Sequence, residues 1–395
     1  MSTAIRRFPP VAAELPFKDV IAAWRSRQPA VECLRDVGAY LGVRHLFPVN
    51  SGRAALYVAL KASLSPGSKV IIPGYTCFTV PAAVVKAGMT PVLSDSDPGN
   101  LGYDLNALAK TVKQHPDTKA IVVCHLFGIA VDMAAIRRAV GSEVLIIDDA
   151  AQAFGLTVKG KLLGADGHVG FYSFGRGKNL ALGGGGLLVT NNDFLAERIG
   201  ALLRDEIEQG KATLRGFLEM LSYDLAVRPL VFGIASRVPG IRLGLSEFNP
   251  DFDVHKAPVE KIRLLRRMYQ TVEILNAQRL EQATRYLSAL GGGTRITIPR
   301  SPVDGRPGSL RFPILVANAG DRARLLKHAA KMGWGFSTMY PTALNRIGQT
   351  PQLAGFDLKG AEYIARTIVT LPTHRLFAAY DKRHGVAETI GQMTA

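Results

Sequence analysis

Lys178 is the residue of this chain whose surroundings point most directly to covalent chemistry. It follows the apolar run 170–174 and precedes four consecutive glycines, 183–186. A lysine in a confined site can lose its proton and form a Schiff base with a carbonyl compound, whereas a solvated lysine has no such role. The hydroxyl of Ser173 can hold a phosphate. Because the glycines open no helix with G-x-G-x-x-G spacing, they predict a flexible turn between two strands instead of a dinucleotide loop.

A second candidate is the pair of carboxylates Asp148 and Asp149, which end the apolar run that begins at Val144. In doubly wound sheets, ligands bind at the carboxyl ends of the strands. An acid there can bind a metal, act as a base, or pair with a protonated ring nitrogen. The alternative is that these carboxylates cap the next helix.

The third candidate is the loop Asn50-Ser51-Gly52-Arg53, which leads straight into an apolar helical pattern. Backbone N–H groups at a helix N-terminus bind phosphate, and Arg53 can add a charge-assisted contact. Ser51 as an ordinary N-cap is the alternative. Together, a phosphate cradle, an acid at a strand end and a lysine are what pyridoxal 5'-phosphate requires.

These residues need a scaffold, and the hydrophobic pattern predicts one. Short β-branched runs at 69–73, 91–93, 120–124, 144–148, 170–174 and 186–190 are separated by helical patterns. This alternation predicts an α/β fold with a mostly parallel central sheet and helices on both faces. We also expect helices over 18–42, 256–290 and 321–332, and a strand over 310–316.

The same pattern predicts four regions. Residues 1–20 are Pro-rich and form an N-terminal arm, and 21–207 form the large α/β domain. Residues 208–255 are an apolar and basic insertion interrupted by Pro229 and Pro239, and 256–395 form a smaller C-terminal α+β domain.

The composition excludes several classes of protein. The chain has 395 residues, of which 47% are hydrophobic and 20% charged, so it can bury a large core. Three cysteines without a C-x-x-C pair predict neither a disulfide framework nor a structural zinc site, and indicate a cytoplasmic protein. We find neither a secretory signal nor the roughly 20 apolar residues of a membrane span. The formal net charge of +16 favours anionic partners, although a dispersed basic surface explains it equally well.

The motifs, taken in order, resemble those of the DegT/StrS-type (DegT/DnrJ family) sugar aminotransferases, which are fold-type-I pyridoxal-phosphate enzymes. The resemblance covers about residues 30–205 and 309–390. It is carried by SGRAALYVAL, PGYT with GMTPVLSD, CHLFGIAVDM, IDDAAQAFG, YSFGRGKN with GGGGLLVT, LRFPILV, Met339-Tyr340-Pro341 and Leu371-Pro372-Thr373-His374.

The resemblance implies a role for each matching residue. Lys178 is implied to link the cofactor, Asp149 to face the pyridine nitrogen, and Gln152 to lie beside the ring. The implied phosphate ligands are Ser173 and the backbone of Gly52 and Arg53. An aromatic residue normally stacks on the ring; Cys77 occupies the aligned position here, and we assign the role to its neighbour Phe78.

Three departures from the family pattern matter. Arg53 stands where many members have Thr, which adds a charge near the phosphate and removes a hydroxyl. A related dehydratase branch has His in place of Lys178, so the lysine favours transamination. Residues 208–255 lack the usual segment that reaches the neighbouring subunit's phosphate, and Asn249 is a candidate replacement.

The resemblance therefore implies an aminotransferase that moves an amino group, with glutamate as the expected donor, to a keto sugar, expected to be nucleotide-linked, in amino-sugar, surface-polysaccharide or secondary-metabolite biosynthesis. A cyclitol or lipid-linked ketone is an alternative acceptor, and a non-catalytic cofactor-binding relic with a basic membrane- or nucleic-acid-binding surface is an alternative function. We expect a homodimer without a nucleic-acid partner. The apolar part of the insertion, 208–248, is interpreted as packing surface, membrane contact or substrate pocket, in that order.

Overall fold

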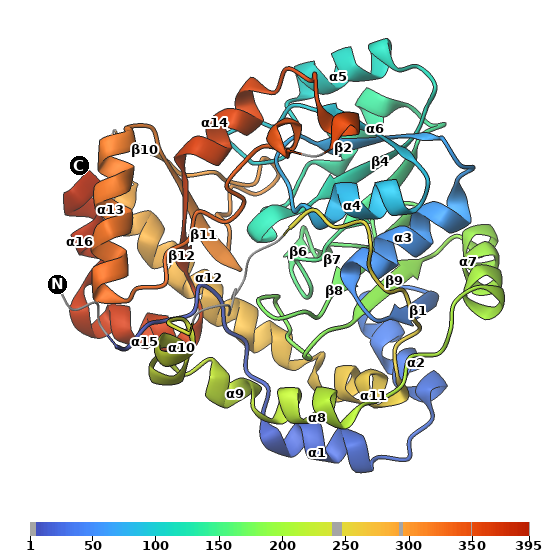
Figure 1. Cartoon of the computed structure of the whole chain (residues 1–395), viewed down its shortest axis with the longest axis horizontal. Helices are drawn as coiled ribbons and strands as arrows, with labels where there is room; N and C mark the ends of the chain where they lie inside the picture. The colour runs from blue at the N-terminus through green and yellow to red at the C-terminus, as the bar shows by residue number, and fades with distance from the viewer. Residues whose placement is uncertain (1–4, 239–246, 292–294, 349, 395) are drawn as a thin grey trace.

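The computed structural model describes residues 5–238, 247–291, 295–348 and 350–394. Its centre is a seven-stranded sheet with the strands in the order β1-β9-β8-β5-β4-β2-β3 (Figure 1). All neighbouring strands from β8 to β3 pair in parallel, and β9 runs antiparallel to both β8 and β1. The strands are β1 His45–Val49, β2 Lys69–Pro73, β3 Thr90–Ser94, β4 Thr118–Cys124, β5 Leu145–Asp149, β8 Val169–Ser173 and β9 Gly186–Thr190. The mostly parallel sheet of the sequence prediction is confirmed.

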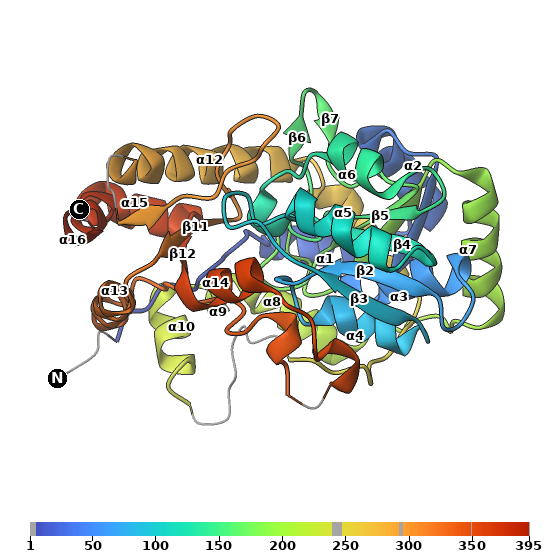
Figure 2. The same cartoon turned by 90° about the horizontal axis from the view of Figure 1, so that it is seen from above.

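Helices cover both faces of this sheet, as Figure 2 shows from above. One face packs against α3 Gly52–Ser63, α4 Thr79–Lys86 and α7 Asp193–Asp205. The other packs against α5 Leu105–Gln114 and α6 Met133–Val140, and, near β8 and β9, against α1 Phe17–Arg25, α2 Ala30–Leu41 and α11 Val259–Met268. Because the strands are buried on both faces, their sequences are continuous apolar runs instead of alternating ones.

The C-terminal part of the chain forms a second, smaller unit, called the small domain below, around a three-stranded antiparallel sheet, β10-β11-β12. These strands are Ile296–Thr297, Arg311–Val316 and Ile368–Pro372. Its core is made with α12 Thr271–Leu290, α13 Ala319–Met332, α15 Arg375–His384 and α16 Val386–Thr394, and Phe8 of the N-terminal arm is buried in it. Outside the insertion, the remaining elements are α14 Lys359–Thr367, the hairpin β6 Thr157–Val158 and β7 Lys161–Leu162, and the 3₁₀ turns Leu126–Gly128 (η1), Leu344–Arg346 and Pro351–Leu353.

Two predicted helices are each broken into two. The helix expected over 18–42 ends at Arg25, and α2 begins only after Pro29, because a residue before proline is disfavoured in helical geometry. The helix expected over 256–290 is divided into α11 and α12 around Tyr269, whose ring packs on Tyr40 at 5.1 Å between centroids. No helix in the described ranges is long and apolar enough to cross a membrane.

The described part of the insertion is helical between residues 214 and 235, whereas 247–255 contain no helix. It contains α8 Leu214–Leu221, α9 Tyr223–Ala226 and α10 Pro229–Ala235, with Pro229 at the first position of α10 as proline prefers. Pro239 lies outside the described residues. α8 packs against α1, so this segment borders the large domain along the lower edge of Figure 1.

Candidate active site

A cavity of about 230 Å³ opens at the carboxyl ends of β4, β5 and β8. It brings together most of the residues singled out from the sequence: Gly52, Arg53, Asp149, Gln152, Ser173 and Lys178. Its other lining residues are Ser51, Leu56, Thr76, Cys77, Thr79, Val80, Cys124, His125, Leu126, Ala151 and Phe171. The three separate motifs therefore share one site.

Asp149 ends β5 and faces this cavity with 9% of its surface exposed. Its Oδ1 accepts a hydrogen bond from the backbone N–H of Ala151 at 2.9 Å, and the thiol of Cys124 donates to Oδ2 at 3.4 Å. Burial raises the pKa of the carboxyl above its ordinary value, and the Ala151 N–H and the positive charge of Lys178 oppose that rise. Asp149 can thus share a proton with a buried cationic partner.

Asp148 lies on the opposite face of the same strand and has a different role. Its Oδ1 lies 2.9 Å from Nε2 of His125, and both side chains are fully buried. Since Nδ1 of His125 accepts the Val131 N–H at 3.1 Å, the ring proton sits on Nε2 and is donated to Asp148. The backbone N–H groups of Gly164 and Asp166 donate hydrogen bonds to the other oxygen of Asp148, Oδ2. No helix starts directly after β5 in the described chain, so neither acid is a helix cap.

Ser51 and Gly52 form the start of α3 beneath the cavity. Ser51 is the N-cap, its Oγ accepting the Ala54 N–H at 3.1 Å. A Cβ on Gly52 would lie 2.7 Å from Cβ of Ser173, so only glycine allows this close approach. The first N–H groups of a helix have no partner inside it, and here they lie beside the Ser173 hydroxyl. Ser51 therefore caps the helix, and the same helix start can also bind an anion.

The side chain of Arg53 makes a cation–π contact with an aromatic ring. Its guanidinium lies 4.6 Å from the ring centroid of Phe252, which also contacts Lys86 at 4.9 Å. Phe252 precedes α11 in the chain, so this contact ties the start of α3 to the C-terminal part of the insertion. Asn249, in the same segment, is exposed, and its reach towards a neighbouring subunit stays a prediction.

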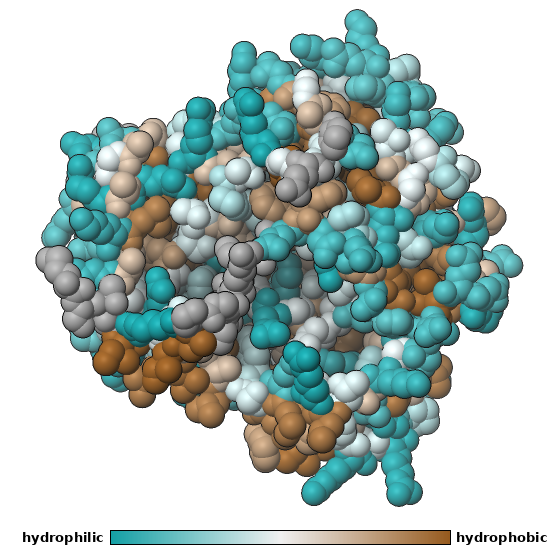
Figure 3. Space-filling model, in the orientation of Figure 1, coloured by the Kyte–Doolittle hydropathy of each residue, from teal (hydrophilic) through white to brown (hydrophobic). Residues whose placement is uncertain are grey.

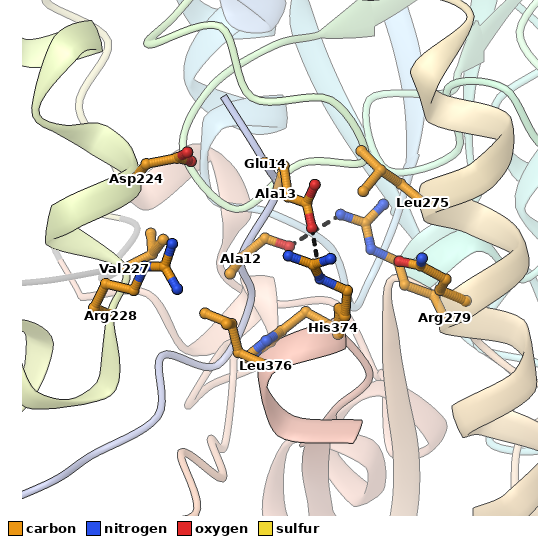
Figure 4. A pocket seen from close by; sticks show the side chains of 12 residues that line it. Ala12, Ala13, Glu14, Asp224, Val227, Arg228, Leu275, Arg279, His374 and Leu376 are labelled. Carbon is orange, nitrogen blue, oxygen red and sulfur yellow. Dashed lines mark hydrogen bonds and ion pairs between the residues drawn. The ribbon is translucent and has the colours of Figure 1, made fainter. Parts of the chain in front are cut away.

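Lys178 lies on the loop between β8 and β9 and is half-buried. The loop is closed by the Phe174 N–H to Gly185 carbonyl bond of 2.9 Å, and Gly183, Gly184 and Gly185 all have positive φ. The predicted turn between two strands is confirmed. On the side of α12, Nη1 of Arg279 donates to the Asn179 carbonyl at 2.9 Å. Its Nη2 donates to the Ala12 carbonyl at 3.1 Å, a contact drawn in Figure 4. The lysine is thus positioned by α12 and the N-terminal arm.

Gln152 joins the cavity to the small domain. Its Oε1 accepts the Phe127 N–H at 3.0 Å, and its Nε2 donates to Oη of Tyr340 at 3.0 Å. Tyr340 was assigned no role from the sequence, where only its place in Met339-Tyr340-Pro341 marked it. Cys77 lines the cavity, whereas Phe78 does not; the Phe78 ring packs on Tyr340 at 5.9 Å. Stacking of Phe78 on a cofactor stays a prediction.

These residues fit pyridoxal phosphate. The cradle at Gly52 and Ser173 suits its phosphate, the buried carboxyl of Asp149 suits its ring nitrogen, and Lys178 is a half-buried amine in the same cavity. The described part of the chain contains no cluster of three or more His, Cys, Asp or Glu residues that could hold a metal ion.

Comparison with known proteins decides the family. Residues 23–238, more than half of the chain, match the model of the DegT/DnrJ/EryC1/StrS aminotransferase family. The chain belongs to this family. The resemblance drawn from the motifs is thereby confirmed.

Individual members of this family differ in how much they share with the chain. It is 38% identical to GDP-perosamine synthase of Caulobacter vibrioides over 174 residues, 44% of this chain and 46% of that protein. It is 30% identical to dTDP-3-amino-3,4,6-trideoxy-alpha-D-glucose transaminase of Streptomyces venezuelae over 85% of this chain and 80% of that protein. It is 28% identical to L-glutamine:2-deoxy-scyllo-inosose aminotransferase of Streptoalloteichus tenebrarius over 91% of this chain and 84% of that protein. The chain spans about half the length of the first three curated relatives, 44–47%.

A solved structure confirms the fold over nearly the whole chain. The Escherichia coli GDP-4-keto-6-deoxy-D-mannose-3-dehydratase with bound hydrated PLP superposes with a TM-score of 0.75, covering 99% of this chain and all of that one, at 16% identity. At this identity the match shows the fold alone, a fold-type-I architecture.

Proposed function

We propose that this family member is a pyridoxal-phosphate-dependent aminotransferase that moves an amino group from glutamate to a nucleotide-linked keto sugar. The observation that carries the proposal is the convergence of Lys178, Asp149 and the Gly52–Ser173 cradle on one cavity. The relatives that match most of this chain are transaminases by name. The test is the visible spectrum of the protein before and after addition of glutamate, with Lys178→Ala as the comparison.

Each side chain has a defined task in this reaction. A bound cofactor would supply an electron sink for the amino-bearing carbon of the donor. Lys178 would provide the amine that holds the cofactor and would move a proton at that carbon. Asp149 would hold a proton at the ring nitrogen. Ser173 and the first N–H groups of α3 would bind the phosphate.

Lys178 also separates this proposal from dehydration. The E. coli dehydratase shares the fold, and the related dehydratase branch carries His at the lysine position. A lysine amine can both anchor the cofactor and transfer the proton, so its presence supports amino transfer. The same chemistry argues against a non-catalytic relic.

The acceptor is proposed to be nucleotide-linked because an excess of 48 Lys and Arg over 32 Asp and Glu suits a diphosphate. A cyclitol ketone is the second candidate, since a relative named for such a substrate matches over 91% of this chain. Incubating the aminated form of the enzyme with candidate ketones separates the two: return of the yellow band with a nucleotide-linked keto sugar alone supports the first.

A homodimer is the proposed assembly. The insertion carries an unusual group of exposed apolar side chains, between 47% and 73% exposed: Leu214, Leu218, Leu225, Leu230, Ile234 and Val238. Figure 3 shows apolar surface over α8 to α10. We assign this face to packing between subunits, with contact to an anionic membrane surface as the second candidate.

Light scattering tests the assignment. Leu218→Glu should convert a dimer to a monomer, whereas Ile274→Glu, at a site on α12 that is also exposed, should not. The alternative outcome is that Leu218→Glu stays a dimer but no longer binds phosphatidylglycerol vesicles. That outcome would favour the assignment of this face to membrane contact. The cytoplasm is the proposed compartment because Cys33, Cys77 and Cys124 form no disulfide.

A further inference from the structure

Cys124 ends β4 beside Asp149 and makes a hydrogen bond with it to which the proposed function assigns no role. The two residues are paired in register across the parallel strands β4 and β5, so their side chains lie on the same face of the sheet. The thiol donates to Oδ2 of Asp149 at 3.4 Å. Cys124 is 4% exposed and Asp149 9%, so this contact is largely shielded from water.

A second hydrogen bond sets the direction of the thiol proton. Oγ1 of Thr76 donates to Sγ of Cys124 at 3.4 Å, and Thr76 is buried as well. Because the sulfur accepts a proton from Thr76, its own proton points to Asp149. Thr76 follows β2, the neighbour of β4 in the sheet, so the chain from Thr76 through Cys124 to Asp149 crosses the carboxyl ends of three adjacent strands.

The surroundings of Cys124 keep its thiol protonated. Burial, and after it the charge of Asp149, raises the pKa of the Cys124 thiol well above its ordinary value. The group is therefore a neutral donor and not a thiolate that would repel the carboxylate. Burial raises the pKa of the Asp149 carboxyl, whereas the Ala151 N–H, the charge of Lys178 and the Cys124 thiol lower it.

Each oxygen of Asp149 accepts from a different kind of donor. Oδ1 accepts the backbone N–H of Ala151 at 2.9 Å, and Oδ2 accepts the thiol. A carboxylate oxygen has two acceptor sites, so both oxygens can still accept from a ligand in the cavity. Any residue except proline supplies a backbone N–H at position 151, whereas the second donor depends on the side chain of Cys124.

We propose that Cys124 is a positioning residue whose thiol, oriented by Thr76, holds Asp149 in its charged form and so keeps the proton on the ring nitrogen of a bound cofactor. This inference rests on the proposed function and adds two residues to its site. A donor to a carboxylate stabilises the charged form relative to the neutral acid. When a carboxylate and a ring nitrogen share one proton, the thiol therefore favours the arrangement with the proton on nitrogen, in which the ring withdraws electrons best.

Infrared spectroscopy of the cofactor-free protein tests the hydrogen bond itself. The S–H stretching band lies in a region without other protein bands, and its frequency falls when the thiol donates. The band that Cys124→Ala removes identifies this thiol. That band should rise in frequency in Asp149→Asn, because an amide oxygen is a weaker acceptor than a carboxylate. An unchanged band in Asp149→Asn would overturn the inference.

NMR of the protein loaded with pyridoxal phosphate isotopically labelled at the ring nitrogen tests the effect on the cofactor. In Cys124→Ala the nitrogen signal should move towards that of the unprotonated ring. In Cys124→Ser, whose hydroxyl is also a donor, the signal should return towards its wild-type position. A role in packing alone would leave the signal in the same place in all three proteins.

The reaction with glutamate gives a third measurement, the loss of the yellow band. Its limiting rate should fall roughly 3- to 10-fold in Cys124→Ala, the loss expected for one hydrogen bond from a weak donor. The half-saturating glutamate concentration should not change, because Asp149 acts on the ring and not on the amino acid. Cys33→Ala is the matched control: Cys33 is also a buried cysteine but packs against Ala257 and Ile262, so neither value should change.

The outcomes separate this inference from the proposed function. If glutamate bleaches the wild type and Cys124→Ala at the same rate and their ring-nitrogen signals coincide, the inference is wrong and the aminotransferase proposal stands. If the signal moves in Cys124→Ala but no α-amino acid bleaches the wild type, Cys124 has the role stated here and the proposed function itself fails. Should Cys124→Ala not fold, Cys124→Val, which fills the space of the thiol without a donor, gives the same comparison.

Discussion

Nε2 of Gln152 donates a hydrogen bond of 3.0 Å to Oη of Tyr340, joining two residues that are 188 positions apart in the chain. Gln152 follows β5 of the large domain, and Tyr340 belongs to the segment between α13 and α14. Both side chains are buried. The bond therefore fixes the small domain against the cavity that contains Lys178.

This bond predicts energetic coupling between the two residues. In a double-mutant cycle of the free energy of unfolding, Tyr340→Phe and Gln152→Ala should show a coupling of about 0.5–3 kcal/mol, because each substitution removes the same hydrogen bond. Tyr286→Phe is the control, since its hydroxyl, also buried in the small domain, donates to the Pro372 carbonyl. Additive effects in the Tyr340 pair would show that the bond contributes nothing.

Gly52→Ala tests the phosphate cradle. The added Cβ would lie 2.7 Å from Cβ of Ser173, so α3 and β8 must move apart. Overpacking of this kind should weaken pyridoxal phosphate binding about 10- to 100-fold, measured by titrating the apoprotein. Gly348→Ala, where a Cβ has no atom within 4 Å, should bind the cofactor normally. Equal affinities would place the phosphate elsewhere.

Substitutions of the adjacent acids Asp148 and Asp149 should affect different properties of the protein, stability for Asp148 and reaction rate for Asp149. Asp149→Asn removes the proton-holding carboxyl from the cavity and should slow the reaction with glutamate about 100-fold or more, with the melting temperature preserved. Asp148→Asn turns an amide NH2 towards N–H donors, either those of Gly164 and Asp166 or that of His125, and should lower the free energy of unfolding by about 1.5–3 kcal/mol. The reverse pattern would contradict the assignment of the two faces of β5.

His374 predicts a loss of stability in mild acid. Burial lowers its pKa to about 4 in the folded protein, where Nε2 donates to the Pro9 carbonyl at 2.9 Å, while the unfolded chain has the ordinary 6.5. Between these values the unfolded state binds the extra proton, so stability falls as pH drops below 6.5. From pH 7.5 to pH 5 this amounts to about 2 kcal/mol.

Urea unfolding of the wild type and His374→Asn at both pH values measures this loss. The variant should lack that part of the pH dependence, because it has no imidazole at residue 374. The same pH dependence in both proteins would show that other groups are responsible.

The sequence predicted those parts of the site that depend on local pattern. Lys178, Asp149 and Ser173 each lie at or just after the end of a strand, and parallel strands place their carboxyl ends together, so their meeting follows from the order of the runs. The close approach of Gly52 to Ser173 was implied only by the resemblance.

Long-range packing could not be predicted in the same way. Tyr340 meets Gln152 at the cavity through the docking of the small domain, which leaves no periodic signal. The break of α1 from α2 had a signal in Pro29, whereas the break at Tyr269 has neither Gly nor Pro and accompanies packing of its ring on Tyr40.

The visible spectrum of the purified protein, recorded with and without glutamate beside Lys178→Ala, tests the central claim most directly. The account predicts a yellow band that glutamate bleaches and that the variant lacks, because Lys178 both anchors the cofactor and transfers the proton. A colourless protein that does not respond to added pyridoxal phosphate would contradict the account.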